Sequence, residues 1–435
     1  MKLSPSEICA IIRVLENNNH KNGKWKMENG KLFKYIFIIF LFIVSLFCIF
    51  SFNKKLADNR TEVVVWTLQM ANFSDYINGI IKEYEAQNPN IKIKWIDVPF
   101  SEGEKRTLAS ILSNNPPDLV NLNPDFSAIL AQKGALEPID EQRLSDFNQD
   151  VVKSLKYNGQ LYAVPWYATS AITIYNKKLF AKSGLKHLPQ TFDELANISG
   201  KIKLKTNAFA YFPTITENDT MLKILNKYGV GVNNIDSDES VKVFDMYKKL
   251  YQQKHIPAES ITQTHQEALE KYMSENVVFY QGGANFLSMI KDNAPNVYQN
   301  TEVAPQIVGK LGQNDFSLMN FIIPVRAKHK KEALDFCLFL TNQKNQLELA
   351  KMTNVISTNK SALKDKFYNS DTDIMARARK YSAQQINHIN PVLHQQNGQK
   401  DINLLVNAAV QSILLNKGNT KTILIQLKKD IERLK

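Results

Sequence analysis

The hydrophobic pattern of this chain becomes regular at residues 62–68, an apolar run typical of a strand that is covered on both faces in a parallel sheet. Apolar residues then recur with helical spacing over 77–84, behind Ser74, which suits an N-cap. Residues 91–95 alternate apolar and polar side chains, as a half-buried strand does. The three segments predict a βαβ unit whose right-handed crossover makes its strands parallel neighbours.

The same alternation of strand and helix continues along the chain. A helix is predicted over 102–113, followed by a turn at 114–117 and a short strand at 118–122. A second helix is predicted over 125–133, and Gly134 ends it. This rhythm predicts an α/β fold.

Short polar side chains follow two of the predicted strands. Gln69, Asn72 and Ser74 come after the first strand, and Asn123 and Asp125 come after the third. In an open α/β sheet, ligands bind beyond the carboxyl ends of the strands, so these residues are candidate ligand contacts. Asn72, Ser74 and Asp125 could equally serve only as helix caps.

The middle of the chain carries a dense series of local signals. Asn158-Gly159 predicts a two-residue hairpin, and 161–167 and 171–175 predict two strands. A short helix is predicted over 176–183, and 191–194 has the form of a capping box that opens the next helix.

A glycine pair follows a further short strand. Residues 277–280 are apolar, and Gln281-Gly282-Gly283-Ala284-Asn285 precedes a helix predicted from about Phe286. Glycines before a helix let backbone N–H groups approach an anion or a hydroxyl-rich ligand. The alternative is an ordinary tight turn between strand and helix.

Residues 35–52 form an 18-residue stretch without a charge, which as a helix measures about 27 Å and matches a bilayer core. The interpretation is a transmembrane anchor, with 1–34 as a short basic cytoplasmic tail and the body from about 57 onward outside the cell membrane. A cleaved signal peptide, cut after Ser51, is the alternative. Lipid attachment at Cys48 is disfavoured, because bulky Phe47 precedes it.

Composition excludes several classes of protein. The chain has 435 residues, of which 44% are hydrophobic and 22% charged, which is globular composition rather than disordered, collagen-like or disulfide-rich composition. The net charge of +12 is mild for this length, and no dense stripe of Lys and Arg predicts a nucleic-acid partner. Cys337 is the one cysteine after position 57, so the body is predicted to have no internal disulfide.

Motifs of catalysis are missing from the sequence. The seven histidines form no metal-binding spacing, no phosphate-binding loop occurs, and no G-x-S-x-G is present. The S-x-x-K matches at 288–291 and 361–364 lack their companion motifs, and Asp193-Glu194 fits helix capping. The sequence therefore predicts neither an enzyme nor a bound metal or cofactor.

The order of the motifs resembles the extracytoplasmic solute-binding proteins of ABC importers, in the sugar-binding group that includes maltose-binding protein (family 1). The Gly159–Tyr167 string GQLYAVPWY is the most specific piece. The other pieces, in family order, are 63–72, 117–120, 130–140, 175–184, 192–195, 279–285, 303–305, 321–325, 333–341, 406–416 and 424–432.

The resemblance implies a two-lobed periplasmic-binding-protein-like fold of type II, with a hinge and an interlobe ligand cleft. Lobe 1 would comprise about 57–165 plus part of 320–390, and lobe 2 about 170–315 plus the C-terminal helices. Such proteins close around the ligand by a hinge motion. They deliver it to a permease driven by ATPases and perform no chemistry themselves, and a monomeric binding domain is expected.

The resemblance also implies ligand contacts. Trp166 and Tyr167 match a position that often faces the cleft, where an aromatic ring can stack on a sugar; Trp166 is the first choice, and its neighbour then packs in the core. Further contacts carried over by position are Asn72, Asn123 and Asp125 in the first lobe, Gly282, Gly283 and Asn285 in the second, and Asn320 near the hinge. Many relatives have Gly-Pro-Trp where this chain has Gly283-Ala284-Asn285, so an aromatic platform is missing on that side.

The expected function is capture of a sugar or oligosaccharide for an ABC permease by a membrane-anchored binding protein. Two alternatives stay open. The first is a membrane-tethered binding module that serves a sensor or takes another small solute such as a glycerol phosphate, and the second is a hydrolase on an unrecognised α/β fold.

Overall fold

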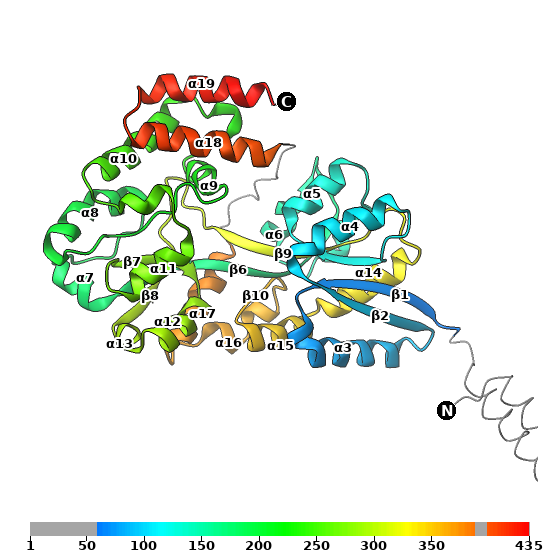
Figure 1. Cartoon of the computed structure of the whole chain (residues 1–435). Coiled ribbons are helices and arrows are strands. Elements are labelled where there is room, and N and C mark those ends of the chain that lie inside the picture. Colours follow the sequence, from blue (N-terminus) through cyan, green and yellow to red (C-terminus); the bar gives the residue numbers. More distant parts are fainter. Residues whose placement is uncertain (1–58, 388–397, 435) are drawn as a thin grey trace, which may run out of the picture. The chain divides into compact units, whose positions relative to one another are not determined.

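The computed structural model describes residues 59–387 and 398–434 (Figure 1). The predicted tail at 1–34 and the predicted anchor at 35–52 lie outside this part. Within it, no helix combines the length and the apolar character that crossing a bilayer requires.

The first part of the chain alternates strands and helices, as the hydrophobic pattern predicts. Its elements are β1 (Thr61–Leu68), α3 (Ser74–Gln87), β2 (Ile91–Val98), α4 (Gly103–Leu112), β3 (Leu119–Leu122), α5 (Pro124–Gln132), α6 (Gln149–Ser154), β4 (Lys156–Tyr157) and β5 (Gln160–Leu161). The first strand is parallel to β2 and β3, which confirms the predicted βαβ unit. Between β4 and β5, Asn158 and Gly159 both have positive φ, which confirms the predicted hairpin turn.

The rest of the described chain is richer in helices. It comprises β6 (Ala163–Asn176), α7 (Lys177–Ser183), α8 (Phe192–Thr206), α9 (Thr220–Asn226), α10 (Asp238–Gln252), α11 (His265–Met273), β7 (Phe279–Gly283), α12 (Phe286–Asn293), α13 (Pro295–Gln299), β8 (Thr301–Ala304), β9 (Phe316–Ile322), α14 (Lys330–Leu340), α15 (Gln343–Thr353), β10 (Ile356–Ser357), α16 (Lys366–Asn369), α17 (Ile374–Gln385), α18 (Gln399–Leu414) and α19 (Thr420–Glu432).

One long strand replaces the two strands predicted at 161–167 and 171–175. In β6 the residues from Ala163 to Ser170 pair with β9, and those from Ala171 to Asn176 pair with β7 and β8. The expected break is absent from this strand because residues 168–170 contain no Gly or Pro and continue the ladder with β9. The strand therefore links the two halves of the sheet (Figure 1).

Buried apolar side chains gather in three clusters. The first holds β1, β3, the first half of β6 and much of α14, including Cys337, which is buried as expected of a packing residue. The second joins α8, α10, α18 and α19, and the third joins the end of β6 to α11, β7 and α12. We call the part around the first cluster the first lobe, and the part around the other two the second lobe.

Helix starts show which local signals the structure uses. Thr191 Oγ1 accepts a hydrogen bond from the Glu194 N–H (3.2 Å), as the capping box predicts, although Glu194 reaches back to the Gln190 N–H (2.8 Å). Ser74 is not an N-cap: a 3-10 turn at Ala71–Phe73 runs directly into α3, and no side chain caps that helix.

The glycine pair lies in a strand rather than in the expected turn. Gly282 and Gly283 pair with Ile172 and Ala171 as part of β7. A Cβ at Gly282 would stand 2.5 Å from Tyr280 Cε1 and 2.9 Å from Phe286 Cδ2, so this position must be glycine for the two rings to pack.

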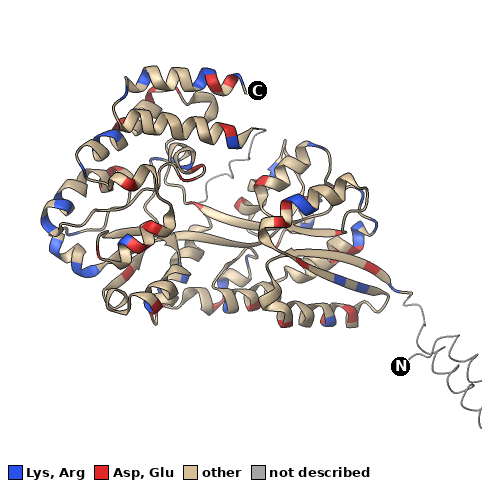
Figure 2. Cartoon of the chain, viewed as in Figure 1, with Lys and Arg blue, Asp and Glu red and all other residues tan. Residues whose placement is uncertain are grey.

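Acidic and basic side chains are interspersed along the helices of both lobes (Figure 2). Many form ion pairs at the surface, such as Arg143 with Asp335 (2.8 Å) and Lys344 with Glu83 (2.8 Å). Exposed pairs of this kind contribute about 0–1 kcal/mol each, so the apolar clusters carry most of the stability.

Candidate functional site

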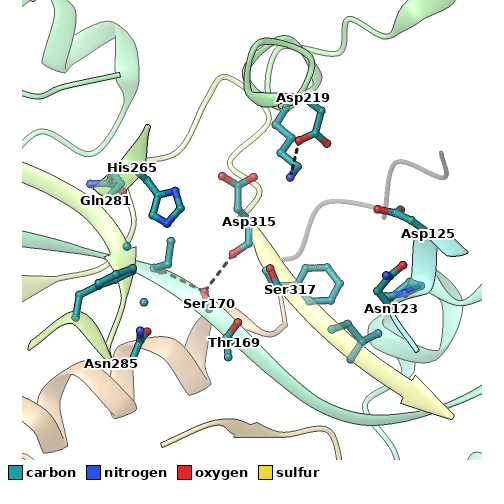
Figure 3. Close-up of a pocket in the computed structure, with 18 of the residues that line it drawn as sticks. Asn123, Asp125, Thr169, Ser170, Asp219, His265, Gln281, Asn285, Asp315 and Ser317 are labelled. Carbon is teal, nitrogen blue, oxygen red and sulfur yellow. Dashed lines mark hydrogen bonds and ion pairs between the residues drawn. The ribbon is translucent and has the colours of Figure 1, made fainter. Parts of the chain in front are cut away.

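A cavity of about 590 Å³ lies where side chains from both lobes meet the strands that link them. In the close-up, Asn123 and Asp125 face His265, Gln281 and Asn285 from the opposite side (Figure 3). Thr169 and Ser170 on β6, Ser317 on β9, and Asp315 just before β9 lie between them. Its volume falls within the range of roughly 300–1,000 Å³ that ligand pockets occupy.

The first lobe contributes the N-terminus of α5. Asn123 is the N-cap: its Oδ1 accepts a hydrogen bond from the Phe126 N–H (2.8 Å), and its Nδ2 donates to Glu104 Oε1 (2.8 Å). Pro124 occupies the first helical position, where no N–H is needed. The capped first turn of α5 positions Asp125 so that its side chain lines the cavity.

Asp125 is the carboxylate with the most unusual surroundings. Burial raises the pKa of Asp125 to about 6; the carboxylates of Asp219 and Glu104 act in the same direction, and Lys223 opposes them. Its Oδ1 is buried and has no hydrogen-bond partner among the described residues. A ligand hydroxyl that donates to this oxygen would satisfy it.

The second lobe contributes side chains that are already paired. Lys223, on α9, places its Nζ 3.0 Å from Asp219 Oδ1. His265, the first residue of α11, places its Nδ1 2.6 Å from Glu217 Oε1. Gln281 is held from both ends: its Nε2 donates to Thr173 Oγ1 (2.8 Å), and its Oε1 accepts from the Ile307 N–H (3.2 Å). These contacts hold the polar groups of this wall in place before a ligand arrives.

A polar network supports the linking strands. Gln385 Nε2 donates to Ser170 Oγ (2.7 Å) on β6, and Ser170 Oγ donates to the Asp315 carbonyl (3.3 Å). The carboxylate of Asp315 is paired with Lys227, whose side chain is almost fully buried. The Ser170 hydroxyl is therefore fixed by Gln385 of α17 and by the Asp315 carbonyl just before β9, and the Asp315 carboxylate is fixed by Lys227 at the end of α9.

Three aromatic rings line the cavity: Tyr280, Phe286 and Phe316. Tyr280 and Phe286 meet edge to face, with ring centroids 5.5 Å apart and planes at 88°. Aromatic rings beside placed hydroxyl, amide and carboxylate groups match the two faces of a sugar, which offers C–H groups and hydroxyls.

Five of the sequence-predicted contacts lie at the cavity, namely Asn123, Asp125, Gly282, Gly283 and Asn285. The other five do not line it.

The expected stacking role of Trp166 is wrong. Its side chain is 0% exposed and packs in the first cluster, with its ring centroid 4.7 Å from that of Phe321 and 5.0 Å from that of Tyr167. Tyr167 lies beside it, and burial raises the pKa of Tyr167 to about 12. The pairing of β6 with β9 shifts register between Pro165 and Tyr167, and both rings stay with the first lobe's core.

Gln69, Asn72 and Asn320 also require correction. Gln69 and Asn72 are exposed and do not line the cavity. The turn after β1 is held instead by Asp97, whose carboxylate accepts hydrogen bonds from the N–H groups of Met70 and Ala71. Asn320 is buried in β9, where its Nδ2 donates to Ser127 Oγ (2.9 Å), so it is part of the core.

The sequence-based interpretation missed the residues on the linking strands and on α9 and α11. Thr169 and Ser170 follow the GQLYAVPWY string after one intervening residue, so the string marked the right segment but the wrong side chains. Asp219, His265 and Asp315 carry no local signal, because only the folded chain brings them to the same cavity as Asp125.

Comparisons with known proteins agree with this geometry. Residues 70–347 match the model of the family described as bacterial extracellular solute-binding protein. The multiple sugar-binding protein of Streptococcus mutans is 25% identical over 324 residues, which cover 66% of this chain and 74% of that protein.

Two solved structures illustrate the shared fold. A Synechococcus sp. MITs9220 protein, assigned as an oligosaccharide periplasmic-binding protein, has a TM-score of 0.74 at 24% identity, covering 85% of this chain and 98% of its own. The maltose-bound T. maritima MalE3 has a TM-score of 0.65 at 20% identity, covering 86% and 100%. At these identities the likeness shows the two-lobed fold, which confirms the fold expected from the sequence.

Proposed function

The chain belongs to the bacterial extracellular solute-binding proteins, and from this premise we propose that it captures a carbohydrate in the cavity between its lobes. The observation that carries the proposal is the lining of that cavity, where three aromatic rings stand beside hydroxyl, amide and carboxylate groups. This combination suits a ligand that presents both apolar C–H faces and many hydroxyls. The sugar-binding relatives among the matched proteins support it.

We propose that the chain binds its solute without transforming it. The charged groups of the second-lobe wall are engaged in pairs, Asp219 with Lys223 and His265 with Glu217, and Asp315 just before β9 is paired with Lys227. Charged groups that are already paired orient a ligand more readily than they exchange protons with it.

The lobe boundaries belong to the proposal too. Lobe 1 would hold about 57–165 plus part of 320–390, and lobe 2 about 170–315 plus the C-terminal helices. The crossing of β6 from its β9 partner to its β7 and β8 partners near Ser170 supports a boundary there.

We further propose that residues 35–52 anchor the chain in the cell membrane, that the binding lobes lie outside it, and that the loaded protein delivers its solute to an ABC permease. The charge-free run in the sequence supports the anchor, and family membership supports the delivery. The binding lobes are expected to act as a monomer.

A thermal-shift screen of the full chain tests the carbohydrate proposal. The panel contains mono-, di- and oligosaccharides, glycerol phosphates, amino acids and polyamines. A ligand that binds the folded state alone stabilises it by about 2.7 kcal/mol at a hundredfold excess over Kd. A rise in melting temperature with a saccharide is expected, and a response confined to the other classes would contradict the proposal.

Two asparagine variants provide a matched pair for any saccharide that responds. Asn285→Ala removes an exposed amide that lines the cavity, whereas Asn72→Ala removes an exposed amide outside it. The saccharide-induced shift should shrink in Asn285→Ala and stay unchanged in Asn72→Ala.

A further inference from the structure

A second, smaller cavity of about 240 Å³ lies next to the main one, in the second lobe. The linings of the two cavities share His265, Tyr280, Gln281, Lys223 and Asp315, so the cavities adjoin. The smaller cavity, which we call the side cavity, lies among α9, α10, α11 and β7.

The side cavity is a gap between two apolar clusters. Phe192, Tyr247 and Phe279 belong to the second cluster, and Phe212 and Ala268 belong to the third. Because the clusters meet here without closing over each other, aromatic faces are left lining a space. Aromatic walls favour a flat, apolar group.

Two buried tyrosine hydroxyls lie beside each other in this lining. Tyr211 and Tyr247 are almost fully buried, and their hydroxyls interact with each other but form no hydrogen bond with any other described group. Burial raises the pKa of both hydroxyls, so both stay protonated and can donate. A pair of hydroxyls uses only one of its two hydrogens, so one donor remains for a ligand atom that reaches the pair, and a buried donor without an acceptor is costly.

The charged groups at the mouth of the side cavity are paired with one another, so they do not select a charged ligand. Lys227 is paired with Asp315 and lies over the Phe192 ring, 4.8 Å from its centroid, and Lys223 is paired with Asp219. The mouth is therefore polar but balanced, while the interior is aromatic.

We propose that the side cavity binds an aromatic substituent with a polar atom at its tip, carried by the saccharide in the main cavity. The inference depends on the proposed function only for the saccharide part of the ligand. At about 240 Å³ the side cavity lies below the roughly 300–1,000 Å³ typical of separate ligand pockets, which suits one substituent of a larger ligand. The ligand class is thus an aryl glycoside rather than an unmodified sugar.

Fluorine NMR with 4-fluorophenol tests the side cavity by itself. The full chain should broaden or shift the fluorine signal. Ala268→Leu, which fills the space between the clusters, should abolish the effect. Tyr247→Phe keeps the ring but removes one hydroxyl, and should weaken binding about threefold to tenfold, the equivalent of one hydrogen bond. Melting curves of both variants establish that they fold. If Ala268→Leu does not fold, the test relies on Tyr247→Phe alone.

Paired glycosides separate this inference from the proposed function. Phenyl glycosides of glucose, galactose and mannose should bind more tightly than the matching methyl glycosides, and the advantage should vanish in Ala268→Leu. If methyl and phenyl glycosides bind equally and 4-fluorophenol gives the same signal in the wild type and Tyr247→Phe, the inference is overturned while the carbohydrate proposal stands. If 4-fluorophenol binds but no methyl or phenyl glycoside does, the carbohydrate proposal is overturned and the aromatic site stands.

Discussion

At the scale of single residues, Asp125 is the group whose protonation bears most directly on ligand capture. Its carboxylate lines the cavity with one buried oxygen unpartnered in the described part of the chain, and burial raises its pKa to about 6. The ionised form is the better acceptor for ligand hydroxyls. Ligand binding and ionisation of Asp125 should therefore favour each other.

This coupling predicts that saccharide affinity rises as pH rises from 5 to 7.5. Below about pH 6 the free protein holds a proton on Asp125, and that proton must leave before the carboxylate can accept two hydroxyls. Isothermal titration at several pH values measures the dependence. In Asp125→Asn, which cannot ionise, the dependence should flatten, and an unchanged pH profile would rule out the role of Asp125.

The stability of the folded chain depends on pH in the opposite direction to ligand affinity. The pKa of Asp125 in the folded chain lies above its ordinary value of 3.8, so the folded state binds the extra proton between these values. Its contribution to the free energy of unfolding is present below pH 3.8 and is lost as pH rises through about 6. Asp125→Asn should accordingly gain stability relative to the wild type at pH 7 more than at pH 4, as urea titrations at the two pH values would measure.

Trp166 has a different role, in stability. Because its side chain is fully buried against Phe321, Trp166→Ala should lower the free energy of unfolding by about 3–5 kcal/mol. Affinity for a saccharide should be unchanged under conditions where the variant is folded, since the ring does not line the cavity. Denaturant unfolding and calorimetry measure the two effects; a large loss of affinity in the folded variant would restore Trp166 as a ligand contact.

At the scale of elements, β7 shows how backbone spacing shapes the site. Gly282 lies between the two rings of Tyr280 and Phe286, and any Cβ would overlap both. The strand thus brings two aromatic rings to the cavity by omitting one side chain. The sequence pattern indicated a different role for the glycines, namely to let backbone N–H groups approach a ligand.

Gly282→Ala should displace the rings and weaken saccharide binding by about 1–3 kcal/mol, the range for overpacking a well-filled site. Gly79→Ala is the matched control, because Gly79 lies on the exposed face of α3 with no described heavy atom within 4 Å of its added Cβ. The control should gain about 0.5–1 kcal/mol of stability from helix propensity and bind normally. Equal affinities for the two variants would show that the ring geometry does not matter for binding.

At the scale of the whole molecule, the linking strands join the two lobes beneath the cavity. Ser170 on β6, Asp315 beside β9 and Gln385 on α17 form one network at this level. A ligand that contacts both lobes favours the closed arrangement, because only there are all of its contacts made.

Closure should shrink the molecule on ligand addition. Small-angle neutron scattering of the full chain in contrast-matched detergent should give a smaller radius of gyration with a saturating saccharide than without it. Asn285→Ala should need more saccharide to reach the same compaction, since it removes a contact from one wall. Identical radii in the presence and absence of a bound ligand would exclude hinge closure.

Local interactions decide the features that sequence reasoning predicted well. The Asn158-Gly159 turn, the helix start at Thr191 and the strand pair β1 and β2 depend on residues within a few positions or on a simple hydrophobic period. Such features survive in any context that buries the apolar face. The order of these elements, together with the GQLYAVPWY string, was enough to indicate the family, and the family match confirms that indication.

Tertiary contacts decide which side chain of each segment reaches the ligand. Trp166 and Thr169 lie three residues apart on one strand, yet the first fills a core and the second lines the cavity. Phe321 packs against the indole ring in the core of the first lobe, whereas Thr169 lies just before β6 changes its partner from β9 to β7 and β8. Asp219, His265 and Asp315 line the same cavity as Asp125 although they are far from it in the sequence, and no local pattern encodes that arrangement. The side cavity exists because two apolar clusters meet without filling the space between them, a consequence of packing density that becomes visible only when both are folded.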